Sequence, residues 1–142
     1  MIKNISFTQI CELWEYLHPL RNHLEYSNMK YLNGFGKIHH VDVFYFGYYD
    51  NDKLVGVNSC HMSEPDKFRS RGLYVLEKYR NKNIGNKLLK HTIEHSFKYV
   101  NFVWSFPRKK SLPVYQRAGF KKTSEFMKAD YGLNCYVSIE SK

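Results

Sequence analysis

The sequence predicts an ordered α/β (α+β) domain, and three observations lead to this fold class. Its 142 residues suffice for one domain that buries a core without disulfides or metals. Segments with helical and strand periodicity follow one another along the chain in the order ααββ-βαβαββ. No internal repeat, linker or low-complexity segment divides the sequence, so we expect residues 1–142 to form a single domain.

Two helices are expected at the start of the chain. The first has Thr8 as its expected N-cap, and its apolar positions at helical spacing are Ile10, Leu13, Trp14 and Leu17. The second opens at Pro19, because proline is favoured at the first position of a helix. It ends before Gly34 and Gly36, and its apolar positions are Leu20, Leu24 and, as a candidate, Tyr31. We expect His39 and His40 in a loop.

The middle of the chain predicts strands. An aromatic run over residues 43–49 and a second run over 54–62 indicate a β-hairpin around a turn at 50–53. A loop at 63–67, which contains Pro65, leads to another strand at 69–76.

An amphipathic helix is expected over residues 84–97. Its apolar stripe is Ile84, Leu88, Leu89, Ile93 and Phe97, and its polar side is Lys87, Lys90, His91, Glu94 and Lys98. A buried strand at 100–106 and a short helix at 111–117 follow, and Ala118 and Gly119 end this helix. Residues 120–127 and 131–139 are expected to form a closing antiparallel pair.

Composition limits the partners and the compartment. A net charge of +9 favours anionic partners, although charge alone does not choose among nucleic acid, membranes and phosphorylated ligands. The three cysteines are far apart and lack CxxC spacing, which argues against a disulfide framework and a zinc knuckle and favours a reducing compartment. We find no signal peptide or membrane span, so a cytoplasmic location is expected.

The stretch over residues 71–89 is the segment most suited to chemistry. An apolar strand runs into a basic loop that opens into the amphipathic helix, whose first-turn N–H groups suit a phosphate. Arg80, Lys82 and Lys87 add positive charge, and Gly85 lets a ligand approach the backbone. Asn81 and Asn83 tolerate left-handed backbone angles, so a nest of N–H groups is feasible. An ordinary strand-to-helix turn is the competing interpretation, and the P-loop and GxGxxG patterns are absent.

Two motifs in this half of the chain resemble the GNAT superfamily of N-acetyltransferases. The run from Val75 through Arg80 to Gly85 is similar to the pyrophosphate loop of that family, and Leu88-Leu89 matches the helix that follows it. The run Ser111-Leu-Pro-Val-Tyr115-Gln-Arg-Ala-Gly119-Phe120 resembles its later tyrosine helix. The resemblance covers about residues 69–126 and departs from the family pattern at Glu77, Asn83, Arg108 and Ser111.

The resemblance implies a fold, a cofactor and a cofactor site. We expect the GNAT fold, with a mixed, mostly antiparallel central sheet flanked by helices, in a monomer or homodimer. The implied cofactor is acetyl-CoA (coenzyme A). The implied cofactor-binding residues are Tyr74, Val75, Leu76, Arg80, Asn81, Lys82, Asn83, Ile84, Gly85, Asn86, Lys87 and Ser111.

The implied reaction is direct attack of a primary amine, on a small molecule or a peptide, on the acetyl thioester. A backbone N–H at Val75 or Leu76 is the expected donor to the thioester carbonyl. Tyr115 is the expected acid, because a phenol stays protonated near neutral pH and can donate to sulfur. Ser105 is a further candidate to face the thioester.

The general base of many relatives, a glutamate, is replaced here by Arg69. Strand alternation, barring a bulge, would place Arg69, Arg71, Leu73 and Val75 on one face. Glu64 or His61 could act as the base, a water chain could carry the proton, or the amine could be partly neutral beforehand. We favour an amine of low pKa, with Arg69 and Arg71 recognising an anionic group on it. Tyr45 is a candidate to line the acceptor pocket.

Two other functions and a metal site are also considered. A GNAT-fold protein that binds CoA without catalysis is compatible with Arg69 and Asn83. A basic nucleic-acid-binding module fits the charge, but no recognised motif supports it, so nucleic acid is not the expected partner. His91 and His95 have a spacing that can bind zinc, yet no third ligand is evident. We therefore expect these histidines on a solvated helix face, and no metal.

Overall fold

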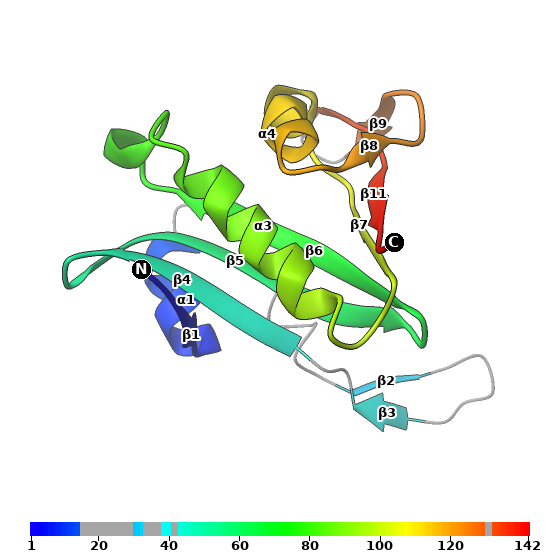
Figure 1. Cartoon of the computed structure of the whole chain (residues 1–142), viewed down its shortest axis with the longest axis horizontal. Helices are drawn as coiled ribbons and strands as arrows, with labels where there is room; N and C mark the ends of the chain where they lie inside the picture. The colour runs from blue at the N-terminus through cyan, green and yellow to red at the C-terminus, as the bar shows by residue number, and fades with distance from the viewer. Residues whose placement is uncertain (15–29, 33–37, 41–42, 130–131) are drawn as a thin grey trace.

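The structure, a computed structural model, describes residues 1–14, 30–32, 38–40, 43–129 and 132–142 (Figure 1). Its main sheet has seven strands in the order β1-β4-β5-β6-β7-β11-β8. These strands are β1 (Ile2–Ile5), β4 (Val43–Asp50), β5 (Lys53–Glu64), β6 (Lys67–Val75), β7 (Phe102–Ser105), β11 (Val137–Glu140) and β8 (Lys121–Lys122). Only β6 and β7 pair in parallel, which confirms the mixed, mostly antiparallel sheet for the described part of the chain.

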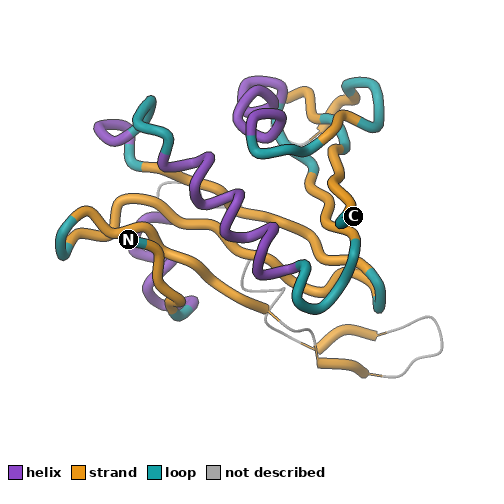
Figure 2. Tube along the Cα trace, viewed as in Figure 1, coloured by secondary structure: helices purple, strands orange, loops and turns teal. Residues whose placement is uncertain are grey.

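Helices lie on both faces of this sheet (Figure 2). Helix α1 (Phe7–Trp14) contacts β4 and β5 on one face, and α3 (Ile84–Ser96) packs against β4, β5 and β6 on the other. Helix α4 (Leu112–Arg117) contacts α3, and short 3₁₀ turns precede α3 and α4 at η2 (Glu77–Tyr79) and η3 (Lys109–Ser111). None of the helices within the described residues is long and apolar enough to cross a membrane.

Two apolar clusters follow from this layering. The α3-side cluster includes the predicted stripe residues Ile84, Leu88, Leu89 and Ile93, all buried, which confirms the amphipathic helix. The smaller α1-side cluster joins Ile10 and Leu13 to Tyr45 and Val57 of the sheet. His91 and His95 do not form a merely solvated face, because both rings contact Phe46 at centroid distances of 4.8 and 5.1 Å.

The start of the chain differs from the prediction. Strand β1, which pairs with β4, precedes the first helix, and α1 begins at Phe7, so Thr8 is not its N-cap. A reciprocal capping box begins the helix instead. The Gln9 N–H donates to Ser6 Oγ at 3.2 Å, and the Ser6 N–H donates to Gln9 Oε1 at 2.9 Å.

The predicted second helix falls largely outside the described residues, as do Leu17, Gly34 and Gly36. Tyr31 belongs to strand β2 (Lys30–Leu32), which pairs with β3 (Ile38–His40). The assignments of Tyr31 to a helix and of His39 and His40 to a loop were therefore wrong.

Two further boundaries differ. The expected loop at 63–67 is a turn of two residues, because β5 continues to Glu64 and β6 begins at Lys67. The expected closing pair is divided: β11 pairs with β8, while β9 (Met127–Ala129) pairs with β10 (Gly132–Asn134). The ladder breaks where the Ser124 hydroxyl accepts the Tyr136 N–H at 2.8 Å in place of a backbone carbonyl.

A bulge in β6 overturns the expected alternation of its side chains. Val57 pairs with Tyr74 while Ser59 pairs with Arg71, so two residues of β6 oppose one of β5. Gly72 lies in this bulge with φ 92°, which glycine adopts without strain. As a result Leu73 and Val75 join the α3-side cluster, Tyr74 joins the α1-side cluster, and Arg69 and Arg71 share the face of Tyr74.

The capping box predicts the effect of two neighbouring substitutions. Ser6→Ala removes the acceptor for the Gln9 N–H and should lower the free energy of unfolding by about 1 kcal/mol. Thr8→Ala is the control, because exposed Thr8 makes no cap and should change stability by less than about 0.5 kcal/mol. Urea unfolding of both variants measures the difference. Equal losses would contradict the assignment of Ser6 as the cap.

Candidate functional site

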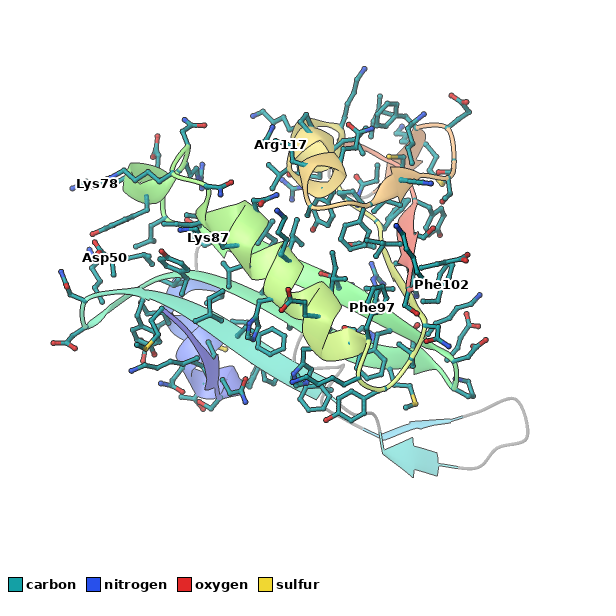
Figure 3. The ribbon with its side chains drawn as sticks, in the orientation of Figure 1. Asp50, Lys78, Lys87, Phe97, Phe102 and Arg117 are labelled. Carbon is teal, nitrogen blue, oxygen red and sulfur yellow. The ribbon has the colours of Figure 1, made fainter. Side chains whose placement is uncertain are left out.

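The site is the cleft that opens where β6 and β7 separate. These strands pair only at Phe68–Val103 and Arg69–Trp104 and then diverge. A cleft of about 630 Å³ lies beyond this fork. Lys78 and Lys87 mark the loop and the first turn of α3 on one side, and Arg117 marks α4 on the other (Figure 3). The cleft is lined by residues 71–75, 79–81, 83–86, 105–108, 110, 111, 114, 115 and 117.

Side-chain hydrogen bonds and a proline hold the fork open. The Ser105 hydroxyl donates to the Ser70 carbonyl at 2.6 Å, at the point where the parallel pairing ends. Pro107 then follows in the chain and has no N–H with which to extend the ladder. The Asn134 amide donates to the Phe106 carbonyl at 2.8 Å, which ties the departing segment to the C-terminal strands.

The loop before α3 has the backbone that a phosphate site requires. Asn81 and Asn83 both adopt left-handed angles, with φ of 64° and 67°, as the sequence predicted. No side chain caps α3 at Asn83. The first-turn N–H groups of Ile84, Gly85 and Asn86 therefore remain available at the positive end of the helix dipole, and all three residues line the cleft.

Gly85 brings this first turn close to the opposite wall. A Cβ added there would lie 3.5 Å from Val114 Cγ1 of α4 and 3.7 Å from Leu73 Cδ2 of β6. These are ordinary contact distances, so the protein alone has room for a methyl group. That space belongs to the cleft and would be lost to any ligand lying on the helix end.

The end of β6 offers one backbone donor to the cleft. The Leu76 N–H donates to Val55 of β5 at 2.9 Å, so Leu76 cannot polarise a ligand carbonyl as predicted. Since successive N–H groups along a strand point to opposite edges, the Val75 N–H points towards the open side of the fork. The Val75 carbonyl, on the same edge, accepts a hydrogen bond from Arg80 Nε at 2.8 Å.

Tyr115 projects from α4 towards the fork. It is 5% exposed, lines the cleft and hydrogen-bonds with Ser105. Burial raises the pKa of Tyr115 above its ordinary value, although the hydrogen bond with Ser105 and the Arg69 charge oppose the shift. The phenol is therefore fully protonated at neutral pH, as an acid must be before it donates.

The two residues expected as bases lie outside the cleft lining. Glu64 is exposed at the far end of β5, with its carboxylate 3.7 Å from Lys67 Nζ. Burial, followed by the charges of Arg69 and Arg71, lowers the pKa of His61 to about 4. A group of that pKa is neutral at pH 7 but a weak proton acceptor.

Of the three residues expected to bind the substrate, one lines the cleft and two do not. Arg71 lines the cleft, and burial followed by the neighbouring Arg69 charge lowers its pKa to about 10. The Arg69 guanidinium lies 4.7 Å from the centroid of the Trp104 ring, beside the fork rather than in the lining. Tyr45 packs in the α1-side cluster and also lies outside the lining.

Most of the residues predicted to bind the cofactor line the cleft, and three do not. Among the expected cofactor residues, the lining includes Tyr74, Val75, Arg80, Asn81, Asn83, Ile84, Gly85, Asn86 and Ser111 but not Leu76, Lys82 or Lys87. Lys110, Val114 and Arg117 on the α4 side also line the cleft and were not predicted, although the basic residues around the tyrosine helix were a visible signal. No group of three potential metal ligands occurs within the described residues.

Solved acetyltransferases share this architecture over nearly the whole chain. An IAA acetyltransferase from Bacillus cereus has a TM-score of 0.76 at 17% identity, with 99% of each chain covered. A GNAT family acetyltransferase from Elizabethkingia anophelis with acetyl-CoA bound has a TM-score of 0.71 at 15% identity, covering 99% of this chain and 97% of that one. A Bacillus subtilis acetyltransferase in complex with CoA has a TM-score of 0.74 at 15% identity, covering 99% and 98%.

Identities this low show the similarity of fold alone, and no curated protein sequence matches the chain significantly. The family assignment comes from the sequence itself. The family model described as "Acetyltransferase (GNAT) family" matches residues 8–120, which is most of the chain. It spans α1, the central strands, the cleft and the tyrosine helix. The protein therefore belongs to the GNAT acetyltransferase family.

Proposed function

We propose that residues 1–142 form one acetyl-CoA-dependent N-acetyltransferase domain that transfers an acetyl group to a primary amine. The observation that carries this proposal is the fork itself. The uncapped first turn of α3, the Val75 N–H and the protonated Tyr115 all border one cleft. The E. anophelis and B. subtilis proteins, whose structures contain acetyl-CoA and CoA, support this choice of cosubstrate.

The lining fits the parts of acetyl-CoA. The diphosphate would lie on the N–H groups of residues 84–86, where helix N-termini bind anions. Arg108, Lys110 and Arg117 would supply positive charge from the facing wall. The unpaired edge of β6 at Val75 would bind the pantetheine arm and direct the thioester towards Tyr115.

The chain's groups would divide the work of the reaction. The acceptor nitrogen forms a bond to the acetyl carbon, and the bond between that carbon and sulfur breaks. The Val75 N–H stabilises the negative charge that develops on the carbonyl oxygen. Tyr115 gives its proton to the departing sulfur, and the nitrogen releases its extra proton to water, which restores the phenol.

The amine would enter the reaction neutral. Neither Glu64 nor His61 reaches the cleft lining, and no carboxylate is among its residues in the described part of the chain. An amine of pKa about 10.4 is neutral in about 0.04% of molecules at pH 7, against over about 10% for a pKa of about 7.8. Without a general base, the free-energy cost of starting from the neutral amine is about 3 kcal/mol smaller for the amine of pKa about 7.8 than for the amine of pKa about 10.4. The site therefore favours an acceptor amine of low pKa.

The lack of a carboxylate in the described lining also favours a second candidate function. A GNAT-fold protein that binds CoA without transferring the acyl group needs no base. Release of free CoA from acetyl-CoA, measured across a panel of amines, separates the two. Stabilisation by acetyl-CoA without amine-dependent CoA release would favour the binding protein.

Gly85→Ala tests the diphosphate site. Saturating acetyl-CoA, at about 100 times its dissociation constant, should stabilise the wild type by about 2.7 kcal/mol. The new methyl group has ordinary contacts, so the ligand-free variant should be as stable as the wild type or more stable, since alanine favours helix. Because the methyl group occupies the cleft, we expect at least about a tenfold loss of acetyl-CoA affinity, which removes about 1.4 kcal/mol of that stabilisation.

Thermal unfolding with and without acetyl-CoA measures both effects. Lys90→Ala, on the exposed side of the same helix, is the control and should retain the full ligand-induced shift. An unchanged shift in Gly85→Ala would exclude a ligand lying on this helix end.

Tyr115→Phe tests the acid. The ring stays in the cluster, so the fold and the affinity for acetyl-CoA should be retained, while kcat should fall about 10²–10⁴-fold because the sulfur leaves unprotonated. Because burial raises the pKa of Tyr115, wild-type kcat should decline only at a pH above that expected for an ordinary phenol, whose pKa is about 10. Steady-state kinetics as a function of pH check both points. A kcat within threefold of the wild type would assign Tyr115 to packing alone.

A further inference from the structure

Arg69 and Arg71, called the arginine pair below, occupy the face of β6 opposite α3, where β7 leaves the sheet. Arg69 lies in register between His61 of β5 and Trp104 of β7, and Arg71 lies opposite Ser59. The register bulge that follows keeps both on the face of the α1-side cluster. The two guanidiniums therefore sit beside one another at the base of the fork.

Among the residues that the structure describes, the arginine pair has none of the acidic partners that partly buried guanidiniums usually have. Arg69 Nε is buried without a hydrogen-bond partner, and no ion pair among the described residues involves either arginine. Glu64, the acidic residue nearest in β5, is instead paired with Lys67. Partly buried like charges are unfavourable without a counter-charge, so this arrangement favours an anionic ligand.

The diphosphate is not that anion. It is assigned to the first turn of α3, which the chain reaches only after β6 and its loop. Arg71 lies opposite Ser59 and Val75 lies opposite Gly56, so the two are separated by three residues of β5, about 10 Å at about 3.3 Å per residue. This separation places Arg71 on the far side of the reacting centre from the phosphate loop. Arg69 interacts electrostatically with Tyr115, which places the arginine pair beside the acid rather than beside the phosphate loop.

We propose that the acceptor is an amine that carries its own oxyanion, a carboxylate or a phosphate, and that Arg69 and Arg71 bind this group. The inference rests on the proposed acetyl transfer and names the substrate class for it. A guanidinium donates two parallel N–H groups, which match the oxygens of either group. Arg71 reaches the anion from the cleft lining, and Arg69 supports it from the base of the fork.

The arginine pair also bears on the protonation of the amine. An ammonium group near two guanidiniums is disfavoured, so the bound amine should lose its proton more readily than in water. His61 illustrates the effect, because its pKa falls to about 4 through burial and the charges of the same two arginines. The positive charge of the arginine pair would thus both bind the anionic group and favour the neutral form of the amine.

Matched pairs of acceptors test the proposal. The carboxylate arm compares leucylglycine and phenylalanylglycine with their C-terminal carboxamides, because the α-amine of a peptide has a pKa of about 8 in both members of such a pair. The phosphate arm compares phosphoethanolamine with ethanolamine. For each pair the ratio of kcat/KM, anionic over neutral, is measured in the wild type and in Arg71→Gln. Taking the quotient of the two ratios cancels the intrinsic difference between the amines. In the arm that matches the natural acceptor, we expect Arg71→Gln to lower the ratio about 10- to 100-fold.

Two other variants accompany Arg71→Gln. Arg69→Lys keeps the charge but loses the planar fork and should lower the ratio by a smaller factor. Lys90→Gln removes one exposed positive charge from the outer side of α3 and should leave the ratio unchanged. Ratios that stay within threefold of the wild type in both arginine variants, in both arms, would overturn the proposal.

A binding measurement separates this inference from the proposed function. Calorimetric titration of the CoA-saturated protein with the same pairs reports acceptor binding without turnover. A preference for the anionic member that Arg71→Gln removes supports the anion site even if no amine is acetylated, in which case only the proposed transfer fails. Turnover of neutral amines with no anionic preference in either measurement overturns the anion site and leaves the transferase.

Discussion

The hydrogen bond from the Ser105 hydroxyl to the Ser70 carbonyl marks the constraint on which the site depends. At this point the parallel pairing of β6 and β7 ends, because a side chain takes the carbonyl that a longer ladder would have used. Beyond it the edge of β6 facing β7 has backbone groups that β7 does not pair. Buried groups of this kind need partners. Arg80 satisfies the Val75 carbonyl, and the Val75 N–H is left for a ligand.

A buried polar cluster connects this fork to the helix that forms its wall. Asn58 Nδ2 donates to Ser70 Oγ at 3.0 Å and to Thr92 Oγ1 at 2.8 Å, so one side chain joins β5, β6 and α3. Thr92 in turn donates to the Leu88 carbonyl at 2.8 Å. Apolar packing alone would let α3 slide along the sheet. Directional hydrogen bonds in a buried setting fix the position of α3 along its own axis relative to β5 and β6. This position of α3 determines whether its first turn reaches the cleft.

Regular periodicity and local motifs were the predictable part of this structure. The stripe of α3, the strands β4 and β5 and the left-handed angles of Asn81 and Asn83 all depend on nearby residues, and the sequence predicted each of them. The capping box at Ser6 and Gln9 has a local signal too, a serine followed three residues later by a glutamine, but the prediction chose Thr8 as the N-cap instead.

Features that depend on distant partners were not predictable in that way. The bulge at Gly72 exists only in relation to β5, and it moved Leu73 and Val75 to the other face from Arg71. The break between β8 and β9 depends on Ser124 meeting Tyr136 across the sheet. The lining outside the motifs, such as Lys110 and Arg117, depends on how α4 packs against the fork. Sequence spacing therefore predicted the cleft lining at the loop before α3 better than the lining on the α4 side.

The two asparagines in the loop before α3 give it a property that glycines would not. The left-handed region is less favourable for asparagine than for glycine, so Asn81 and Asn83 lower the stability of the folded loop slightly. Asparagine also has fewer accessible conformations than glycine in the unfolded chain, so less entropy is lost when the loop orders. The N–H groups of the next turn are then held in place before a ligand arrives. Asn83 is consequently compatible with a preorganised anion site, because its backbone already adopts the left-handed angles that a nest of N–H groups needs.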